Sequence, residues 1–469
     1  MSATKQAALA EPARARSSAA SVAIPAMMVA IPGVLYYSIL FRHLVDLPLL
    51  DDYDAVLGFL NQLAQVKGAA AKFWFFLGAQ HNEYKIFFGH GIAWAQYDAL
   101  GHVNFSAICV LGDFAVAVLA LILWSMFLPE QKDLGKRLTY FVPASWLIFQ
   151  LEYYETLNWA MPSLVTLWVI VFSLGAIGCL LRPSRMSYAG AVVLYVLAIS
   201  SLGNGFLLLP VGLLILVMQR QRARAVGWLV ISAVNIAAYA YHYNFHSSQA
   251  IYSAQSHQHG SVFATLLHLR PDYLLAFLGN AAAIGGASPT YAAISIVLGL
   301  ILLAVFAWMA RRGYAKKNPA IAYSVLFLLL TAVGVAGLRS DFGLTQSLSS
   351  RYTIYGALAL IFAWIMVVEE FLQKRGGPIV NNNPYVAMTG VAVLFGLCMD
   401  YVGNANLSRR ENDAKIGMAA YERTAGTTSL EGPIPPVPFE NDVIKTLRTR
   451  SRAILTESVK LGVYEPPKY

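Results

Sequence analysis

Residues 290–310 read TYAAISIVLGLILLAVFAWMA, an uncharged apolar stretch long enough to cross a bilayer as one helix. Ten further stretches are apolar enough to be expected spans: 22–41, 104–128, 138–152, 161–181, 187–202, 204–219, 226–242, 319–338, 353–372 and 384–402. The 469 residues are 57% hydrophobic and only 13% charged, with a mean hydropathy of +0.55. A soluble protein carries roughly 25% charged residues. The sequence therefore predicts an all-α polytopic membrane protein with about eleven transmembrane helices, and excludes a soluble enzyme, a disordered chain and a disulfide scaffold.

The connections between these stretches predict the orientation of the chain. Lys and Arg concentrate in every second connection, near 129–137, 182–185, 220–224 and 311–317. Acidic residues concentrate in the alternate connections. Because basic residues favour the cytoplasmic side, the N-terminus is expected in the cytoplasm and the C-terminus outside. The net charge of +9 is then explained by topology, and no nucleic-acid partner is expected.

Three regions follow from this topology. Residues 1–21 are a cytoplasmic segment, residues 22–402 form the membrane domain, and residues 403–469 form a small outer tail or cap. The membrane domain carries two large outer loops, 42–103 and 243–289. The first loop has apolar residues at helical spacing, which predicts short helices in the membrane interface. Two alternatives concern the bilayer boundary, namely that 84–100 is itself a span and that 266–280 dips into the membrane.

The first outer loop begins with an acidic motif, Asp51-Asp52-Tyr53-Asp54. Three carboxylates within four residues repel one another, so a cation, a metal or a proton-transfer role would favour keeping them together. A helix N-cap is the alternative, because Asp is favoured at that position. Both roles can hold for different members of the motif.

Three other outer segments carry polar side chains suited to a substrate. The segment His81-Asn82-Glu83-Tyr84-Lys85 places a base, an acid and a histidine together, which fits a phosphate or polar ligand or else a local ion pair. Arg339 and Ser350-Arg351-Tyr352 flank a late span, where arginine binds phosphate oxygens or extends to lipid head groups. Glu155 and Asn158 lie in the connection 152–159, whose aromatic residues also suit the membrane interface.

Several polar residues have a structural explanation of equal weight. Asp113 lies inside an expected span, where it is either functional or a neutral, hydrogen-bonded side chain. His246, His257 and His259 fall in the second outer loop without the spacing typical of a metal site. The three cysteines lie far apart in apolar stretches and are expected to be buried thiols.

At these residues the chain resembles the C-type membrane glycosyltransferases of bacteria, which take a sugar from a polyprenyl-phosphate carrier. The acidic motif stands at the place in the first outer loop where that family has one. His81-Asn82-Glu83-Tyr84-Lys85 resembles a His-Asn-Glu-His-Arg stretch, with Tyr84 and Lys85 as departures, and Ser350-Arg351-Tyr352 and Asn204-Gly205 are also similar. The resemblance covers roughly residues 20–402.

The resemblance implies a site on the outer, periplasmic face of the bacterial inner membrane. Asp51 and then Asp52 are the expected general bases, and inversion at the anomeric carbon is the expected outcome. The residues expected to bind the donor phosphate are Lys85, Arg351, Arg339 and His81. Those expected to bind substrate are Asp54, Glu83, Tyr352, Glu155 and Asn158. No cofactor is required by this scheme, although Asp52 and Asp54 are suited to a divalent metal.

The implied partners are a polyprenyl-phosphate-linked sugar, an envelope glycolipid, polysaccharide or protein acceptor, and the lipid bilayer. A transporter or flippase of a lipid-linked saccharide is the alternative function. It predicts ionisable groups along the bilayer midplane, whereas here only Asp113 lies deep in a span. A polymerase or ligase using a diphosphate-linked glycan would need more arginine in the second outer loop than Arg270 alone.

Overall fold

The computed structural model describes residues 3–244, 269–372, 383–424 and 442–467, and the named secondary-structure elements within them are all helices. Its longer helices are α1 (Ala3–His43), α5 (Phe105–Met126), α6 (Leu134–Ile148), α8 (Trp168–Leu180), α9 (Arg185–Ser201), α10 (Leu208–Met218), α11 (Arg222–Ala240), α15 (Pro289–Arg311), α17 (Pro319–Arg339), α18 (Thr353–Val367), α19 (Asn383–Arg423) and α20 (Asp442–Lys460). Shorter helices are α2 (Phe59–Gln65), α3 (Ala69–Gly78), α4 (Phe87–Leu100), α7 (Ala160–Pro162), α14 (Pro271–Leu278) and α16 (Tyr314–Lys317).

Eight helical segments are long and apolar enough to cross a membrane, which confirms a multi-pass membrane protein. They are Ser21–His43, Phe105–Met126, Ala160–Leu180, Arg222–Ala240, Pro289–Arg311, Pro319–Phe342, Ser350–Phe371 and Pro384–Arg423. The other three expected spans form shorter helices: α6 has 15 residues, α9 has 17 and α10 has 11. A full crossing takes about 20 residues, so eight candidate spans are established by length and composition, and not eleven.

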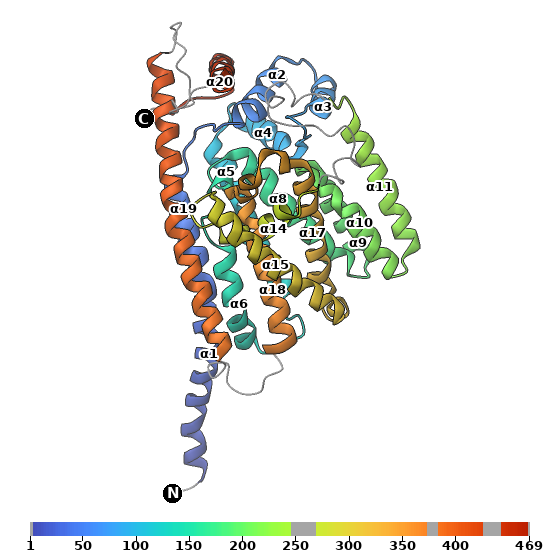
Figure 1. The fold of residues 1–469 in the computed structure, drawn as a ribbon, viewed down its shortest axis with the longest axis vertical. Helices are drawn as coiled ribbons and strands as arrows, with labels where there is room; N and C mark the ends of the chain where they lie inside the picture. Colours follow the sequence, from blue (N-terminus) through green and yellow to red (C-terminus); the bar gives the residue numbers. More distant parts are fainter. Residues whose placement is uncertain (1–2, 245–268, 373–382, 425–441, 468–469) are drawn as a thin grey trace.

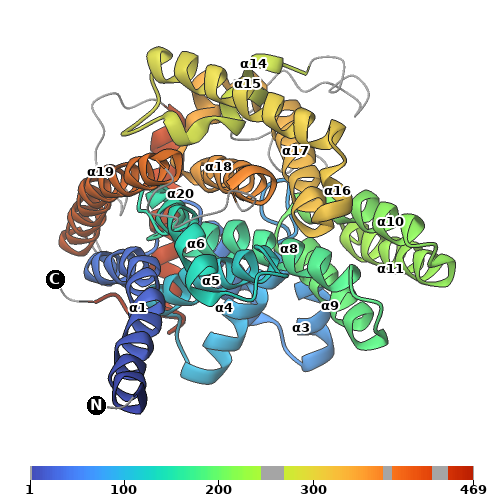
Figure 2. The ribbon, with the colours of Figure 1, turned by 90° about the horizontal axis from the view of Figure 1, so that it is seen from below.

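The helices surround α18, which lies near the centre of the bundle when viewed along its length (Figure 2). Nearly every side chain of α18 is buried, because α6, α14, α15 and α17 all pack against it. Its Trp364 donates a hydrogen bond to the carbonyl of Tyr140 in α6, at 3.0 Å. At the opposite end from the candidate site, buried Glu369 accepts hydrogen bonds from Tyr314 and Asn318, which ties α16 and α17 to the end of α18.

One edge of the molecule is formed by α1 and α19, which run side by side (Figure 1). The 41-residue helix α19 continues without a break past residue 402, the expected end of the membrane domain. His43, at the end of α1, hydrogen-bonds Glu411 and Asn404 of α19, each at 2.8 Å. These bonds join the two helices where the first outer loop begins.

The first outer loop and the C-terminal helix gather at the same end of the bundle (Figure 1). The loop forms α2, α3 and α4, and the 14-residue α4, at the position of the alternative span 84–100, is shorter than the roughly 20 residues of a full crossing. A second hydrophobic cluster joins this loop to the start of α5, the end of α19 and α20. Tyr464, beyond α20, packs on Phe105 with ring centroids 5.4 Å apart. The chain end is therefore part of the framework beneath the candidate site.

Candidate functional site

Asp52, in the acidic motif, is completely buried and holds the first outer loop against the bundle. Its carboxylate accepts hydrogen bonds from the backbone N–H groups of Leu49 at 3.1 Å, Met161 at 2.9 Å and Ala160 at 3.3 Å. Two of these donors are backbone N–H groups at the start of α7, which have no partner within the helix itself. Burial raises the pKa of Asp52 to about 7, against the effect of the backbone donors. The side chain thus acts as a cap between distant segments.

Asp51 lies beside Asp52 but faces outward. Its side chain is 44% exposed, and its Oδ2 lies 3.8 Å from Nε2 of His81. His81 also contacts the side chain of Asn82, at 3.1 Å. Of the three carboxylates in the motif, Asp51 is therefore the exposed one next to a histidine.

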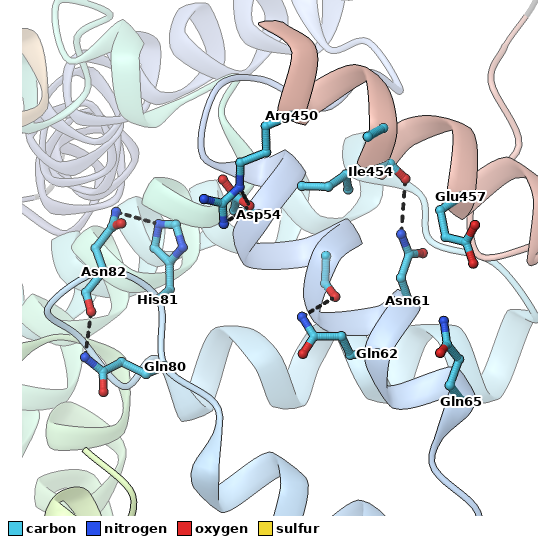
Figure 3. Close-up of a pocket in the computed structure, with 12 residues that line it drawn as sticks. Asp54, Asn61, Gln62, Gln65, Gln80, His81, Asn82, Arg450, Ile454 and Glu457 are labelled. Carbon is cyan, nitrogen blue, oxygen red and sulfur yellow. Dashed lines mark hydrogen bonds and ion pairs between the residues drawn. The ribbon is translucent and has the colours of Figure 1, made fainter. Parts of the chain in front are cut away.

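Asp54, the third carboxylate, pairs with a residue that the sequence analysis does not single out. Its Oδ1 accepts a hydrogen bond from Nε of Arg450 and forms an ion pair with Nη2 of the same residue, each at 2.7 Å (Figure 3). Arg450 belongs to α20, whose basic, amphipathic pattern is the only local signal for such a role. We call Asp51, His81, Asp54 and Arg450 the Asp51 cluster.

Residues 81–84 form a tight turn that connects this cluster to a second one. The backbones of His81 and Tyr84 exchange two hydrogen bonds of 2.9 Å, and Asn82 adopts a φ of +48°, which asparagine tolerates well. Beyond the turn, the Glu83 carboxylate pairs with the Arg339 guanidinium, and Arg339 also donates to the Tyr84 hydroxyl at 3.0 Å. The turn therefore presents His81 to Asp51, and presents Glu83 and Tyr84 to Arg339.

Lys85 follows the turn and is completely buried. Its ammonium donates to the carbonyl of Leu77, at 2.8 Å, and to the carbonyl of Tyr241. These carbonyls end α3 and α11, where the helix dipole favours a positive charge. Burial lowers the pKa of Lys85 to about 8. The contacts of Lys85 join two helix ends to the turn.

The segment before α18 is held by Glu155. The Glu155 carboxylate accepts from the Ser349 hydroxyl at 2.7 Å and from the backbone N–H of Arg351 at 3.2 Å. Ser350 donates to the carbonyl of Glu152 at 2.7 Å, so the two segments are bonded at several points. Farther along, the Asn158 side-chain oxygen accepts from Arg410 of α19, at 3.0 Å. Glu155 and Asn158 therefore position other chain segments.

Arg351 has a different environment from Arg339. Its guanidinium lies 5.4 Å from the Tyr352 ring centroid, and its Nε is buried with no hydrogen-bond partner among the described residues. The Tyr273 hydroxyl, in α14, likewise lacks a partner within that part of the chain. Burial and Tyr352 raise the pKa of Tyr273, while Arg339, Arg351 and Arg270 lower it. These three arginines therefore lie within electrostatic range of one phenol.

We call Arg270, Arg339 and Arg351 with Tyr84, Tyr273 and Tyr352 the arginine cluster. The segment around Asn204-Gly205 also reaches it, since the Asn204 amide donates to the Tyr355 hydroxyl at 3.0 Å. A side chain added at Gly203 would meet the Tyr84 ring at 3.4 Å. Four segments that are far apart in the sequence thus meet at this cluster.

The described residues contain no group of three His, Cys, Asp or Glu side chains arranged to hold a metal ion. Asp52 and Asp54, the expected metal ligands, are bonded to backbone N–H groups and to Arg450 respectively. His246, His257 and His259 lie outside the described residues. Asp113 is buried in α5, and neither of its carboxylate oxygens has a hydrogen-bond partner within the described ranges.

Comparison with known proteins identifies no family. No family model matches the sequence, and no curated protein is significantly similar to it.

Proposed function

We propose that this protein is a glycosyltransferase that moves a sugar from a polyprenyl-phosphate donor to an envelope acceptor on the periplasmic face of the bacterial inner membrane. The proposal rests on the turn at residues 81–84, which touches both clusters. His81 lies beside the exposed carboxylate of Asp51, while Glu83 and Tyr84 contact Arg339. A proton acceptor and a set of cations that contact the same turn suit a displacement that releases a phosphate.

Asp51 is the general base in this proposal. It accepts the proton of the acceptor hydroxyl as that oxygen attacks the anomeric carbon. The new C–O bond forms as the bond to the donor phosphate breaks, and polyprenyl phosphate leaves with the electron pair. A single displacement inverts the anomeric centre. Asp52, whose carboxylate is occupied by backbone N–H groups, positions Asp51.

The arginine cluster binds the donor phosphate in this proposal. Arg351 is the principal ligand, because its guanidinium Nε has no hydrogen-bond partner among the described residues. A guanidinium can also donate two parallel hydrogen bonds to two oxygens of one phosphate. Arg339 shares its charge with Glu83 and Tyr84, and so contributes less. Lys85 is a positioning residue, because its ammonium is engaged by two backbone carbonyls.

The proposal includes the eleven-span topology, with the N-terminus in the cytoplasm and the C-terminus in the periplasm. The shorter helices α6, α9 and α10 then cross the bilayer as well, with the flanking connections completing their length. Basic residues at the connections 129–137, 182–185, 220–224 and 311–317 support this orientation.

The test follows donor consumption by the purified protein in liposomes, using a panel of polyprenyl-phosphate sugars and mass spectrometry. Loss of one donor, through transfer or slow hydrolysis, is the expected result. Asp51→Asn should abolish it, whereas Asp98→Asn, an exposed aspartate in the same loop, should retain it. Equal donor loss in the Asp51→Asn variant would remove Asp51 from the role of base.

A transporter of a lipid-linked saccharide is the second candidate, and buried Asp113 is the observation that favours it. An ionisable group inside a span is a functional candidate by default. The same liposomes separate the two functions. A transporter would move a labelled donor across the bilayer without consuming it, and Asp113→Asn would stop that movement while Asp51→Asn would not.

A further inference from the structure

A cavity of about 610 Å³ lies at the outer end of the molecule, between α2 and α20. Helix α2 contributes one wall and α20 the other, while the turn at residues 81–84 closes one side (Figure 3). Its volume falls within the range of about 300–1,000 Å³ found for small-molecule sites. Neither wall belongs to the arginine cluster, so the cavity is a separate place for a ligand.

Amide side chains dominate the lining of this cavity. They come from two segments, and they are Asn61, Gln62, Gln65, Gln80 and Asn82. Each amide offers both a hydrogen-bond donor and an acceptor in one plane, which matches neighbouring hydroxyl groups on a sugar ring. The lining residues with apolar side chains are Ala453 and Ile454. A lipid chain would leave these polar groups without partners, so the chemistry favours a polyhydroxylated ligand.

One amide at the cavity has an unmet hydrogen-bonding requirement. Asn61 is 6% exposed and donates through Nδ2 to the carbonyl of Ile454, at 3.1 Å. Its Oδ1 has no partner among the described residues. A buried acceptor without a donor destabilises the folded protein. A ligand hydroxyl or a water molecule that donates to Oδ1 of Asn61 would remove that cost in free energy.

The charges at the cavity disfavour an anionic ligand. Arg450, the basic side chain in the lining, is neutralised by Asp54 at 2.7 Å. Glu457 adds a further carboxylate from α20. A phosphorylated or uronic acid ligand would therefore meet a wall without net positive charge.

The cavity also borders the proposed general base. His81 lines it, and Nε2 of His81 lies 3.8 Å from the Asp51 carboxylate. A hydroxyl at this end of a bound sugar would thus lie beside His81, the residue through which the cavity approaches Asp51.

We propose that this cavity is the acceptor subsite, that it binds a neutral saccharide, and that α20 forms one of its walls. That the bound saccharide is the acceptor rests on the proposed function, but saccharide binding itself can be tested independently. It narrows the acceptor to an uncharged glycan end, whether carried by a glycolipid, a polysaccharide or a protein.

Binding is measured by saturation-transfer NMR on the full-length protein in nanodiscs. The probes are neutral trisaccharides of glucose, galactose, mannose, rhamnose or arabinose, with trigalacturonic acid as the anionic comparison. We expect at least one neutral probe to bind and trigalacturonic acid to bind more weakly. Gln62→Leu with Gln65→Leu should weaken binding about tenfold, since two neutral hydrogen bonds are lost. Both side chains are exposed, and Gln62 bonds only within its own helix turn among the bonds described, so folding should be retained.

The matched control is Gln346→Leu, which changes an amide outside the cavity lining and should leave binding unchanged. The proposal fails if no neutral probe binds, if the double variant binds as well as wild type, or if trigalacturonic acid binds best. Donor hydrolysis without acceptor is recorded on the same samples. Donor loss without saccharide binding would overturn only the subsite, whereas saccharide binding without donor loss would overturn the glycosyltransferase proposal.

Discussion

The Asp52 carboxylate accepts a hydrogen bond from the backbone N–H of Met161, 109 residues farther along the chain. This contact fixes the first outer loop to the start of a candidate span. Asp51, its neighbour, is thereby held at the surface beside His81. Asp52 therefore holds the loop in place, and Asp51 provides an exposed carboxylate.

Replacing Asp52 by alanine should destabilise the protein by about 1–3 kcal/mol, because three backbone N–H groups lose their acceptor. Asp52→Asn should cost less, since its side-chain oxygen can still accept. Thermal unfolding in detergent measures both effects. Asp51→Ala is the matched control and should change stability little, and an equal loss there would contradict the capping role of Asp52.

Stability should rise as the pH falls from 8 to 5. Burial raises the pKa of Glu152 to about 7 from an ordinary value of 4.5, so the folded state holds a proton that the unfolded state has released. This contribution is complete below about pH 4.5 and is lost as the pH rises through 7. Asp52 acts in the same direction.

Glu152→Gln should therefore flatten the pH dependence by about 1–3 kcal/mol between pH 5 and 8. The glutamine oxygen can still accept from the backbone N–H of Gly285, a bond of 3.0 Å in the wild type. Chemical unfolding at several pH values measures the difference. An unchanged slope in the variant would show that Glu152 titrates normally in the folded protein.

Arg351→Ala should raise the KM for the lipid-linked donor about tenfold or more, because a hydrogen-bonded charge pair with phosphate is lost. Arg351→Lys should recover part of the loss, since it restores the charge without the planar fork. Arg312→Ala, at the other end of the bundle beside Glu370, is the control. A KM equal to that of wild type would place the phosphate elsewhere.

The orientation can be tested with cysteine variants in a cysteine-free background. Arg423 ends α19 and Lys316 lies in α16, and both are exposed. An impermeant thiol reagent should label Arg423→Cys in spheroplasts, and should label Lys316→Cys only after the membrane is opened. The reverse pattern would invert the topology.

The candidate spans could be predicted from sequence because a bilayer requires long apolar helices, a property of each segment alone. The count was less certain where helices are short. Between α9 and α10, Leu202 is extended with a φ of −153°, and a short 3-10 turn follows. This break falls where the expected spans 187–202 and 204–219 meet, but apolarity alone does not show that the helices on either side are shorter than a full crossing.

The site residues could be chosen from sequence, but their contacts could not. Lys85 follows Glu83 closely, which favours an ion pair, yet its ammonium bonds carbonyls of α3 and α11. Asp54 pairs with Arg450, 396 residues away. No local pattern encodes partners brought together only by the packing of the bundle.

Helix α19 spans about 60 Å at 1.5 Å per residue, roughly twice the hydrocarbon thickness of a bilayer. Its far end holds α20, since Tyr421 and Thr424 hydrogen-bond Thr456 and Arg452. Helix α19 is therefore a candidate membrane span that also supports α20. A proline in the half of α19 nearest α20 would bend the helix and displace α20. The cavity wall that α20 forms would then open, although no residue lining the cavity would have changed.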